Sequence, residues 1–79
     1  AYEGAVLSPM VGTVYLAPEP GAADFINEGD VVKKGQTLFI VEAMKVMNPI
    51  TAPTGGKVTK IFVDNAQPIE FDQPLAIIE

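Results

Sequence analysis

The sequence predicts an all-β fold: a flattened β-barrel or sandwich of two four-stranded antiparallel sheets with an internal pseudo-two-fold duplication. Three observations predict it. The chain repeats itself, its apolar runs are short and rich in β-branched residues, and Gly, Pro, Asn and Asp separate these runs. No run sustains a helical period over three turns. A length of 79 residues suits one small domain, which we expect to span residues 1–79.

The duplication is visible as two aligned stretches. Residues 25–42 align with residues 62–79 at an offset of 37, with Phe, Gln, Leu and Glu matched in the same order. Residues 9–14 align with residues 53–58 at an offset of 44, with Pro, Gly and Val matched. The two offsets differ by seven, so the first half carries seven extra residues before residue 25. Such ordered matches favour a duplication over chance.

Strands are expected where apolar, β-branched runs lie between turn residues. These expected strands cover residues 6–7, 13–15, 31–32, 37–41, 57–63, 69–71 and 75–78.

The duplication also predicts where the link between the halves lies. If a two-fold axis relates the halves, Glu42 takes the place of Glu79, and Met47 takes the place of Glu3. The link, residues 43–46, is then the counterpart of the two chain ends. We therefore expect this link at the pole opposite the termini, which is the arrangement that a carrier arm needs.

The centre of this link is Met44-Lys45, and neither residue favours a tight turn. Two-residue hairpin turns prefer Asn-Gly or Gly-X, because their central residues take positive φ. A non-glycine residue held there costs on the order of 1–3 kcal/mol. The flanking Val46 and Met47 are also apolar. An ordinary solvated lysine is the simpler alternative, but this setting favours a function for Lys45 that folding does not require.

Composition excludes several other functions. The net charge of −5 argues against nucleic acid and anionic membranes as partners, since both attract basic surfaces. The chain has no Cys and no His, so thiolate metal sites and the usual acid–base catalyst are absent. Its one serine, Ser8, has no base to activate it. We expect no catalytic residues and no metal.

At residues 42–45 the sequence reads E-A-M-K, and here it resembles the biotin carboxyl carrier proteins of acetyl-CoA carboxylase. The resemblance covers nearly the whole chain, including SPMVGT, FINEGDVVKKGQ and EAMKVMN, and points to the C-terminal biotinyl domain with its biotinyl/lipoyl-like barrel-sandwich fold. It implies that Lys45 carries covalent biotin. It also implies that a biotin protein ligase recognises the residues around it, namely Glu42, Ala43, Met44, Val46 and Met47.

The extra residues of the first half resemble the thumb of the bacterial and plastid members of this family. The implied thumb, at about residues 17–24, consists of Ala17, Pro18, Glu19, Pro20, Gly21, Ala22, Ala23 and Asp24. Two positions depart from the family pattern. Val46 stands where Met or Leu often follows the lysine, and Ala17 stands where many members have a polar residue. Any thumb contact with biotin at position 17 would then use backbone or apolar surface.

The resemblance implies a non-catalytic carrier component of a multi-subunit acetyl-CoA carboxylase. Biotin on Lys45 would accept a carboxyl group at the biotin carboxylase subunit and deliver it to the carboxyltransferase subunits, forming malonyl-CoA for fatty acid biosynthesis. The expected location is the cytoplasm. Three alternatives stay open: a lipoyl domain, a domain of another biotin enzyme, and an unmodified interaction module of the same fold.

Overall fold

A computed structural model describes residues 4–79 of the chain. Within this range it contains no helix and eight strands. The strands are β1 (Ala5–Leu7), β2 (Gly12–Tyr15), β3 (Val31–Val32), β4 (Thr37–Ala43), β5 (Val46–Thr51), β6 (Gly56–Ile61), β7 (Gln67–Ile69) and β8 (Pro74–Ile78).

The strands form two four-stranded antiparallel sheets. One has the order β1-β8-β6-β3 and the other the order β5-β4-β2-β7. The sheets share one hydrophobic core and do not close into a barrel, and the molecule is flattened, with extents of 31 × 28 × 19 Å. The predicted fold class is confirmed.

The internal two-fold symmetry extends to the strand register. Strands β1 to β4 correspond to β5 to β8, and this exchange converts the order of one sheet into that of the other. The pair Val6↔Ala76 in one sheet has its counterpart in Phe39↔Ile50 of the other. Each half therefore contributes strands to both sheets, and neither half can bury its apolar face without the other.

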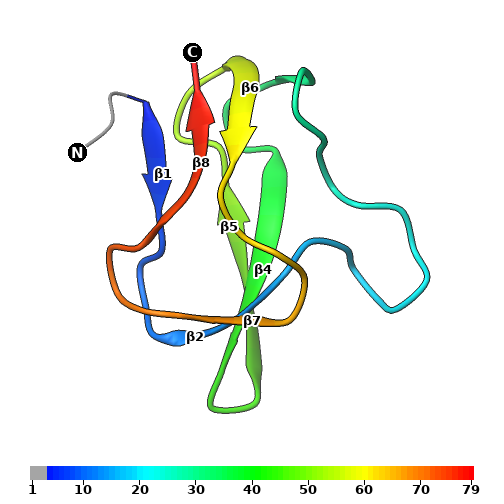
Figure 1. The fold of residues 1–79 in the computed structure, drawn as a ribbon, viewed down its shortest axis with the longest axis vertical. Coiled ribbons are helices and arrows are strands. Elements are labelled where there is room, and N and C mark those ends of the chain that lie inside the picture. The colour runs from blue at the N-terminus through cyan, green and yellow to red at the C-terminus, as the bar shows by residue number, and fades with distance from the viewer. Residues whose placement is uncertain (1–3) are drawn as a thin grey trace.

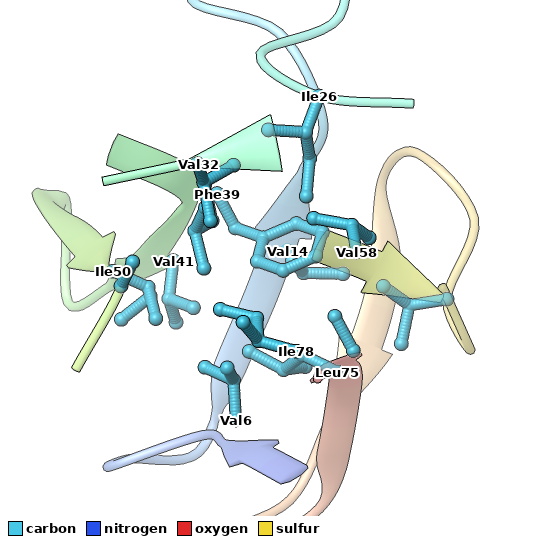
Figure 2. Packing of buried hydrophobic residues seen from close by; sticks show 14 of the residues in the cluster. Val6, Val14, Ile26, Val32, Phe39, Val41, Ile50, Val58, Leu75 and Ile78 are labelled. Atoms are coloured by element: carbon cyan, nitrogen blue, oxygen red, sulfur yellow. The ribbon is translucent and has the colours of Figure 1, made fainter. Parts of the chain in front are cut away.

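The core follows the same symmetry. Fifteen hydrophobic residues and Ser8 are buried among the described residues, and Figure 2 shows the Phe39 ring projecting into the middle of the cluster. By the two offsets, every buried residue has a buried counterpart. These pairs are Val6/Ile50, Ser8/Ala52, Val14/Val58, Ile26/Val63, Val32/Ile69, Leu38/Leu75, Phe39/Ala76 and Val41/Ile78.

Gly12 and Gly56, which the repeat aligns, are required by close backbone approach. A Cβ on Gly12 would overlap the carbonyl oxygen of Glu42, and one on Gly56 would overlap that of Glu79. Glycine alone lets these strands pass so close to the strands they pair with. The sequence repeat therefore records a steric requirement that both halves share.

Two kinds of turn are also repeated, each closed by a side chain. Asp30 accepts the N–H of Asn27 at 2.9 Å, and Gln67 accepts that of Asp64 at 2.9 Å in the equivalent turn. Likewise Gln36 accepts the N–H of Lys33 at 3.1 Å, and its counterpart Gln73 accepts that of Glu70 at 2.8 Å. The matched Gln residues of the sequence are therefore turn-closing groups.

The structure corrects several expected boundaries. Strand β5 was not expected, because Asn48 and Pro49 interrupt its apolar pattern, although Pro is tolerated on an edge strand such as this. Strand β6 ends at Ile61 and β7 at Ile69, so Phe71 lies in a turn. Glu3, the expected counterpart of Met47, lies outside the described residues.

The segment without a counterpart has eight residues, as the predicted bounds 17–24 imply, although the two halves differ by seven. A bulge between Val58 and Lys60 in β6 adds one residue to the second half, so that Tyr15 corresponds to Lys60. Residue 16 then corresponds to residue 61, and residues 17–24 have no counterpart. Because the bulge lengthens the second half by one residue, the difference in length between the halves is one less than the length of the unmatched segment.

The β4–β5 hairpin forms one end of the molecule, and β1 begins and β8 ends toward the other (Figure 1). The loop that contains residues 17–24, light blue to cyan, projects from one side (Figure 1). The link is thus placed as the two-fold symmetry predicts.

Replacing Ala66 with glycine should raise the free energy of unfolding by about 0.5–1 kcal/mol. Ala66 has φ of 64°, whereas its counterpart is Gly29, with φ of 99°. Relief of the left-handed strain, about 1–2 kcal/mol, is partly offset by the greater freedom of glycine in the unfolded chain. The matched control Gly29→Ala should destabilise by a similar amount, although its Cβ would meet no atom within 4 Å. Urea unfolding measures both, and a destabilised Ala66→Gly would contradict the expected relief of strain.

Candidate modification site on the β4–β5 hairpin

The hairpin closes through a two-residue turn whose central residues both have left-handed backbone. Ala43 pairs with Val46, and between them Met44 has φ of 52° and Lys45 has φ of 65°. Two successive positive φ values define a type I′ turn, which matches the twist of antiparallel strands but favours Asn-Gly. The expected strain at Met44-Lys45 is therefore present in the structure.

The tip presents Lys45 to solvent among exposed apolar side chains. Met44 is 96% exposed, Val46 55% and Met47 59%. Lys45 is exposed, and within residues 4–79 no hydrogen bond or ion pair holds its amine. A free amine at the end of a protruding hairpin is accessible to an enzyme that modifies it.

Side chains at the base hold the hairpin in place. Asn48 donates from Nδ2 to the carbonyl oxygens of Val41 at 3.2 Å and Val46 at 3.1 Å, which ties the two strands together beside the tip. On the neighbouring strand β2, Tyr15 Oη donates to Glu42 Oε1 at 3.2 Å. The base of the hairpin is thus held on both sides.

The phenol of Tyr15 remains protonated in this contact. Partial burial raises the pKa of Tyr15 above its ordinary value, and both the hydrogen bond to Glu42 and the negative charge of that carboxylate raise it further. The phenol is therefore a donor to Glu42 throughout the physiological range.

The thumb, residues 17–24, contains an ordered turn. Ala22 donates its N–H to the carbonyl oxygen of Glu19 at 3.1 Å, with Pro20 and Gly21 between them, and Gly21 has φ of 83°. This is a type II turn, which favours Pro at its second position and Gly at its third. The Pro-rich segment is therefore a shaped loop.

Two hydrogen bonds anchor the base of the thumb. Phe25 donates its N–H to the Leu16 carbonyl oxygen at 2.8 Å, which brings the ends of the thumb together. Leu16 in turn donates its N–H to Oδ1 of Asn65 at 2.9 Å, on a turn of the second half. The thumb thus leaves the domain from a fixed position.

A groove of about 300 Å³ separates the thumb from the base of the hairpin. Its lining is Tyr15, Ala17, Pro18, Glu19, Pro20, Ile40, Met47 and Asn65. The other thumb residues lie outside this lining: Gly21, Ala22, Ala23 and Asp24. The groove is mostly apolar, and position 17 offers it a methyl group and backbone.

The structure places predicted residues of the hairpin and the thumb around one groove. Four further residues contribute to this site, and sequence reasoning did not single them out. Tyr15, Ile40 and Asn65 complete the groove, and Asn48 clamps the hairpin. Alternation along β4 was the available signal for Ile40, whereas the interrupted pattern of β5 gave none for Asn48. Asn65 comes from a distant turn and gave no such signal.

The described residues offer no other site of comparable chemistry. No group of three or more His, Cys, Asp or Glu residues in the range 4–79 could hold a metal ion. The same range contains no helix that is long and apolar enough to cross a membrane.

Replacing Met44-Lys45 by Asn-Gly should stabilise the fold by about 1–2 kcal/mol, because this pair suits the type I′ turn. The same change removes the amine. The control Met44→Ala should shift the free energy of unfolding by less than about 0.5 kcal/mol, since this side chain is 96% exposed. Thermal unfolding distinguishes the two. An Asn-Gly variant no more stable than the native chain would show that the turn is unstrained.

Proteins of similar sequence share one description. A carrier protein from Pseudomonas aeruginosa, named biotin carboxyl carrier protein of acetyl-CoA carboxylase, is 56% identical over 92% of this chain and 47% of its own length. A protein of the same name from a Nostoc species is 53% identical over 94% of this chain and 41% of its own length. A chloroplastic relative from Arabidopsis thaliana is 47% identical over 94% of this chain and 26% of its own length. The chain thus spans less than half the length of these relatives.

A solved structure supports the same relationship. A single-chain, multi-domain long-chain acyl-CoA carboxylase superposes with a TM-score of 0.79 and 26% identity, over 96% of this chain and 7% of that one. A family model described as biotin-requiring enzyme matches residues 4–78. With nearly all of its described residues inside that match, the chain belongs to the biotin/lipoyl domain family of biotin-requiring enzymes.

Proposed function

We propose that this chain is the biotin carrier domain of an acetyl-CoA carboxylase and that biotin is joined by an amide to the Lys45 side chain. The observation that carries this proposal is the exposed, unbonded amine at the tip of a strained hairpin, in a chain of the biotin-requiring family. The names of the similar proteins support the choice of enzyme.

The residues around Lys45 suit this group. The amine can form an amide without breaking a hydrogen bond or ion pair within residues 4–79. Beside the hairpin, the groove of about 300 Å³ offers apolar walls with a few polar atoms, among them those of Asn65 and Tyr15. When bound, biotin supplies a ring nitrogen that takes up and releases a carboxyl group.

The chain itself contributes presentation and tethering rather than catalysis. Asn48 and the Tyr15–Glu42 contact fix the base of the hairpin, and its tip points away from the start of β1 and the end of β8 (Figure 1). A tethered arm reaches each active site at a high effective concentration, because its encounters no longer depend on free diffusion. We assign Glu42, Ala43, Met44, Val46 and Met47 to recognition by a biotin protein ligase.

The remaining steps belong to other components. We propose a biotin carboxylase subunit and carboxyltransferase subunits as partners, with malonyl-CoA for fatty acid biosynthesis as the product. The proposed location is the cytoplasm. The thumb, in this proposal, restrains the arm by offering the apolar side of the groove, with Pro18 and Pro20 limiting its movement.

Co-expression with a biotin ligase and biotin should add ~0.2 kDa to the native chain and nothing to Lys45→Arg. Arginine keeps the positive charge but lacks the amine that forms the amide. Intact mass measures the gain, and peptide mapping assigns it. The four other lysines of the chain serve as internal controls. An unchanged mass in a folded native chain would contradict the proposal. A gain with a lipoyl ligase instead would indicate a lipoyl domain.

Biotin attachment should change the amide NMR signals of groove residues, because the restrained arm lies against them. The informative positions are Ala17, Ile40 and Asn65, which line the groove. The matched controls are Ile77 and Glu28, the counterparts of Ile40 and Asn65 in the repeat. Their amide chemical shifts should not change. Shifts confined to the hairpin tip would show that the thumb does not restrain the arm.

A further inference from the structure

A second exposed apolar surface lies away from the hairpin tip. Seven large hydrophobic side chains are exposed within residues 4–79, and four of them lie outside the hairpin. One of the four, Val31, is in β3, and the other three lie at the end of β1 and in the β1–β2 and β7–β8 connections. They are Leu7 at 44% exposure, Val11 at 59% and Phe71 at 63%. Exposed apolar groups that gather in one region mark surfaces for binding other molecules.

Backbone hydrogen bonds hold these two turns together. Ser8, in the β1–β2 connection, receives the N–H of Asp72 at 2.8 Å and donates its own N–H to Gln73 at 2.9 Å. Leu7 pairs with Pro74 on the adjoining strands. The exposed residues Glu70 and Asp72 lie on either side of Phe71 in the sequence, and each carries a carboxylate. We call this surface the turn face, and it consists of Leu7, Val11, Glu70, Phe71 and Asp72.

The fold does not require the character of the turn face. The equivalent turns of the other half make the same hydrogen bonds, from Gly35 to Ala52 at 2.8 Å and from Ala52 to Gln36 at 2.8 Å. Yet the counterpart surface is polar and basic. Its residues, in the order of the turn face, are Thr51, Gly55, Lys33, Lys34 and Gly35. The two pairs of turns thus have the same hydrogen bonds, but one is apolar and acidic and the other is polar and basic.

Position distinguishes the two surfaces further. In Figure 1 the β1–β2 and β7–β8 connections lie on the side away from the thumb, in the half of the molecule that carries the hairpin. A protein that takes the Lys45 side chain into an active site must approach this half. The turn face is thus beside the path of approach.

Building on the proposed function, we propose that the turn face docks the carrier onto the component that carboxylates the Lys45-linked group. The partner surface is a protein surface with an apolar pocket for Phe71 and Val11, bordered by Lys or Arg side chains that meet Glu70 and Asp72. Opposite charges at such a border guide association and orient the partners, and the apolar centre supplies affinity.

Charge selects this component over the transferase. Carboxylation consumes bicarbonate and a nucleoside triphosphate, both anions, so basic groups must surround the point that the arm reaches. The acyl thioester that receives the carboxyl group is uncharged at its reacting end. An acidic face beside the hairpin therefore complements the entrance to the first site more than the second.

The test uses the intact carrier protein, loaded with biotin to completion as verified by mass. Phe71→Ser and Glu70→Lys should each raise KM for the carrier in the carboxylase half-reaction about tenfold, with kcat unchanged. Their matched controls, Lys34→Ser and Lys33→Glu, change the equivalent positions of the basic surface and should leave KM unchanged. Added salt should raise KM for the native carrier, and less so for Glu70→Lys.

Each outcome decides the matter. Variants that keep the native melting temperature and the native KM would overturn the docking assignment. So would a raised KM in the carboxyltransferase half-reaction alone, because the face would then serve the other component. If the native carrier accepts no biotin, the proposed function itself fails, and the docking assignment fails with it.

Discussion

The burial of each half of the chain against the other is the constraint on which the molecule depends. Neither half forms a sheet of its own, since β4 and β2 of the first half pair with β5 and β7 of the second, respectively, and β8 and β6 of the second half pair with β1 and β3 of the first. Buried residues occur in equivalent pairs, and Phe39 opposite the small Ala76 is the largest departure from equal volume. This packing places the start of β1 and the end of β8 toward the pole opposite the hairpin (Figure 1).

Three of the four non-glycine residues with positive φ in the range 4–79 lie at the hairpin tip or on the turn face, and the fourth is Ala66. The type I′ turn would accept Asn-Gly, but it holds Met44 and Lys45 at positive φ. Asp72 also holds positive φ, where its counterpart is Gly35. The strand pairs around these turns supply the stability that tolerates such positions. A rigid base below a strained, exposed tip lets the amine be offered without weakening the core.

Sequence reasoning reached the fold class because the repeat, the β-branched runs and the turn residues all agreed. It placed Lys45 at the right pole because symmetry alone fixes that position. It missed β5, where Asn48 and Pro49 obscure the apolar pattern, and the two offsets gave only the net difference of seven residues between the halves. That count could not reveal the bulge in β6, which depends on how the strand pairs.

The groove was the least predictable part of the site. Its residues come from the thumb, from β2, β4 and β5, and from a turn of the second half that holds Asn65. Contacts between such distant segments depend on the packing of both sheets, which no local pattern encodes. The turn face has the same origin, since Val11 and Phe71 are far apart in the chain, and the hydrogen bonds of Ser8 and the pairing of β2 with β7 bring their two connections together.

The most direct measurement is transfer of label from radioactive bicarbonate to the biotin-loaded chain by a biotin carboxylase with ATP. Label bound to the loaded native chain, and absent from both the unloaded chain and Lys45→Arg, is the result expected of a biotin carrier. A loaded, folded chain that acquires no label, or equal label on Lys45→Arg, would contradict that role.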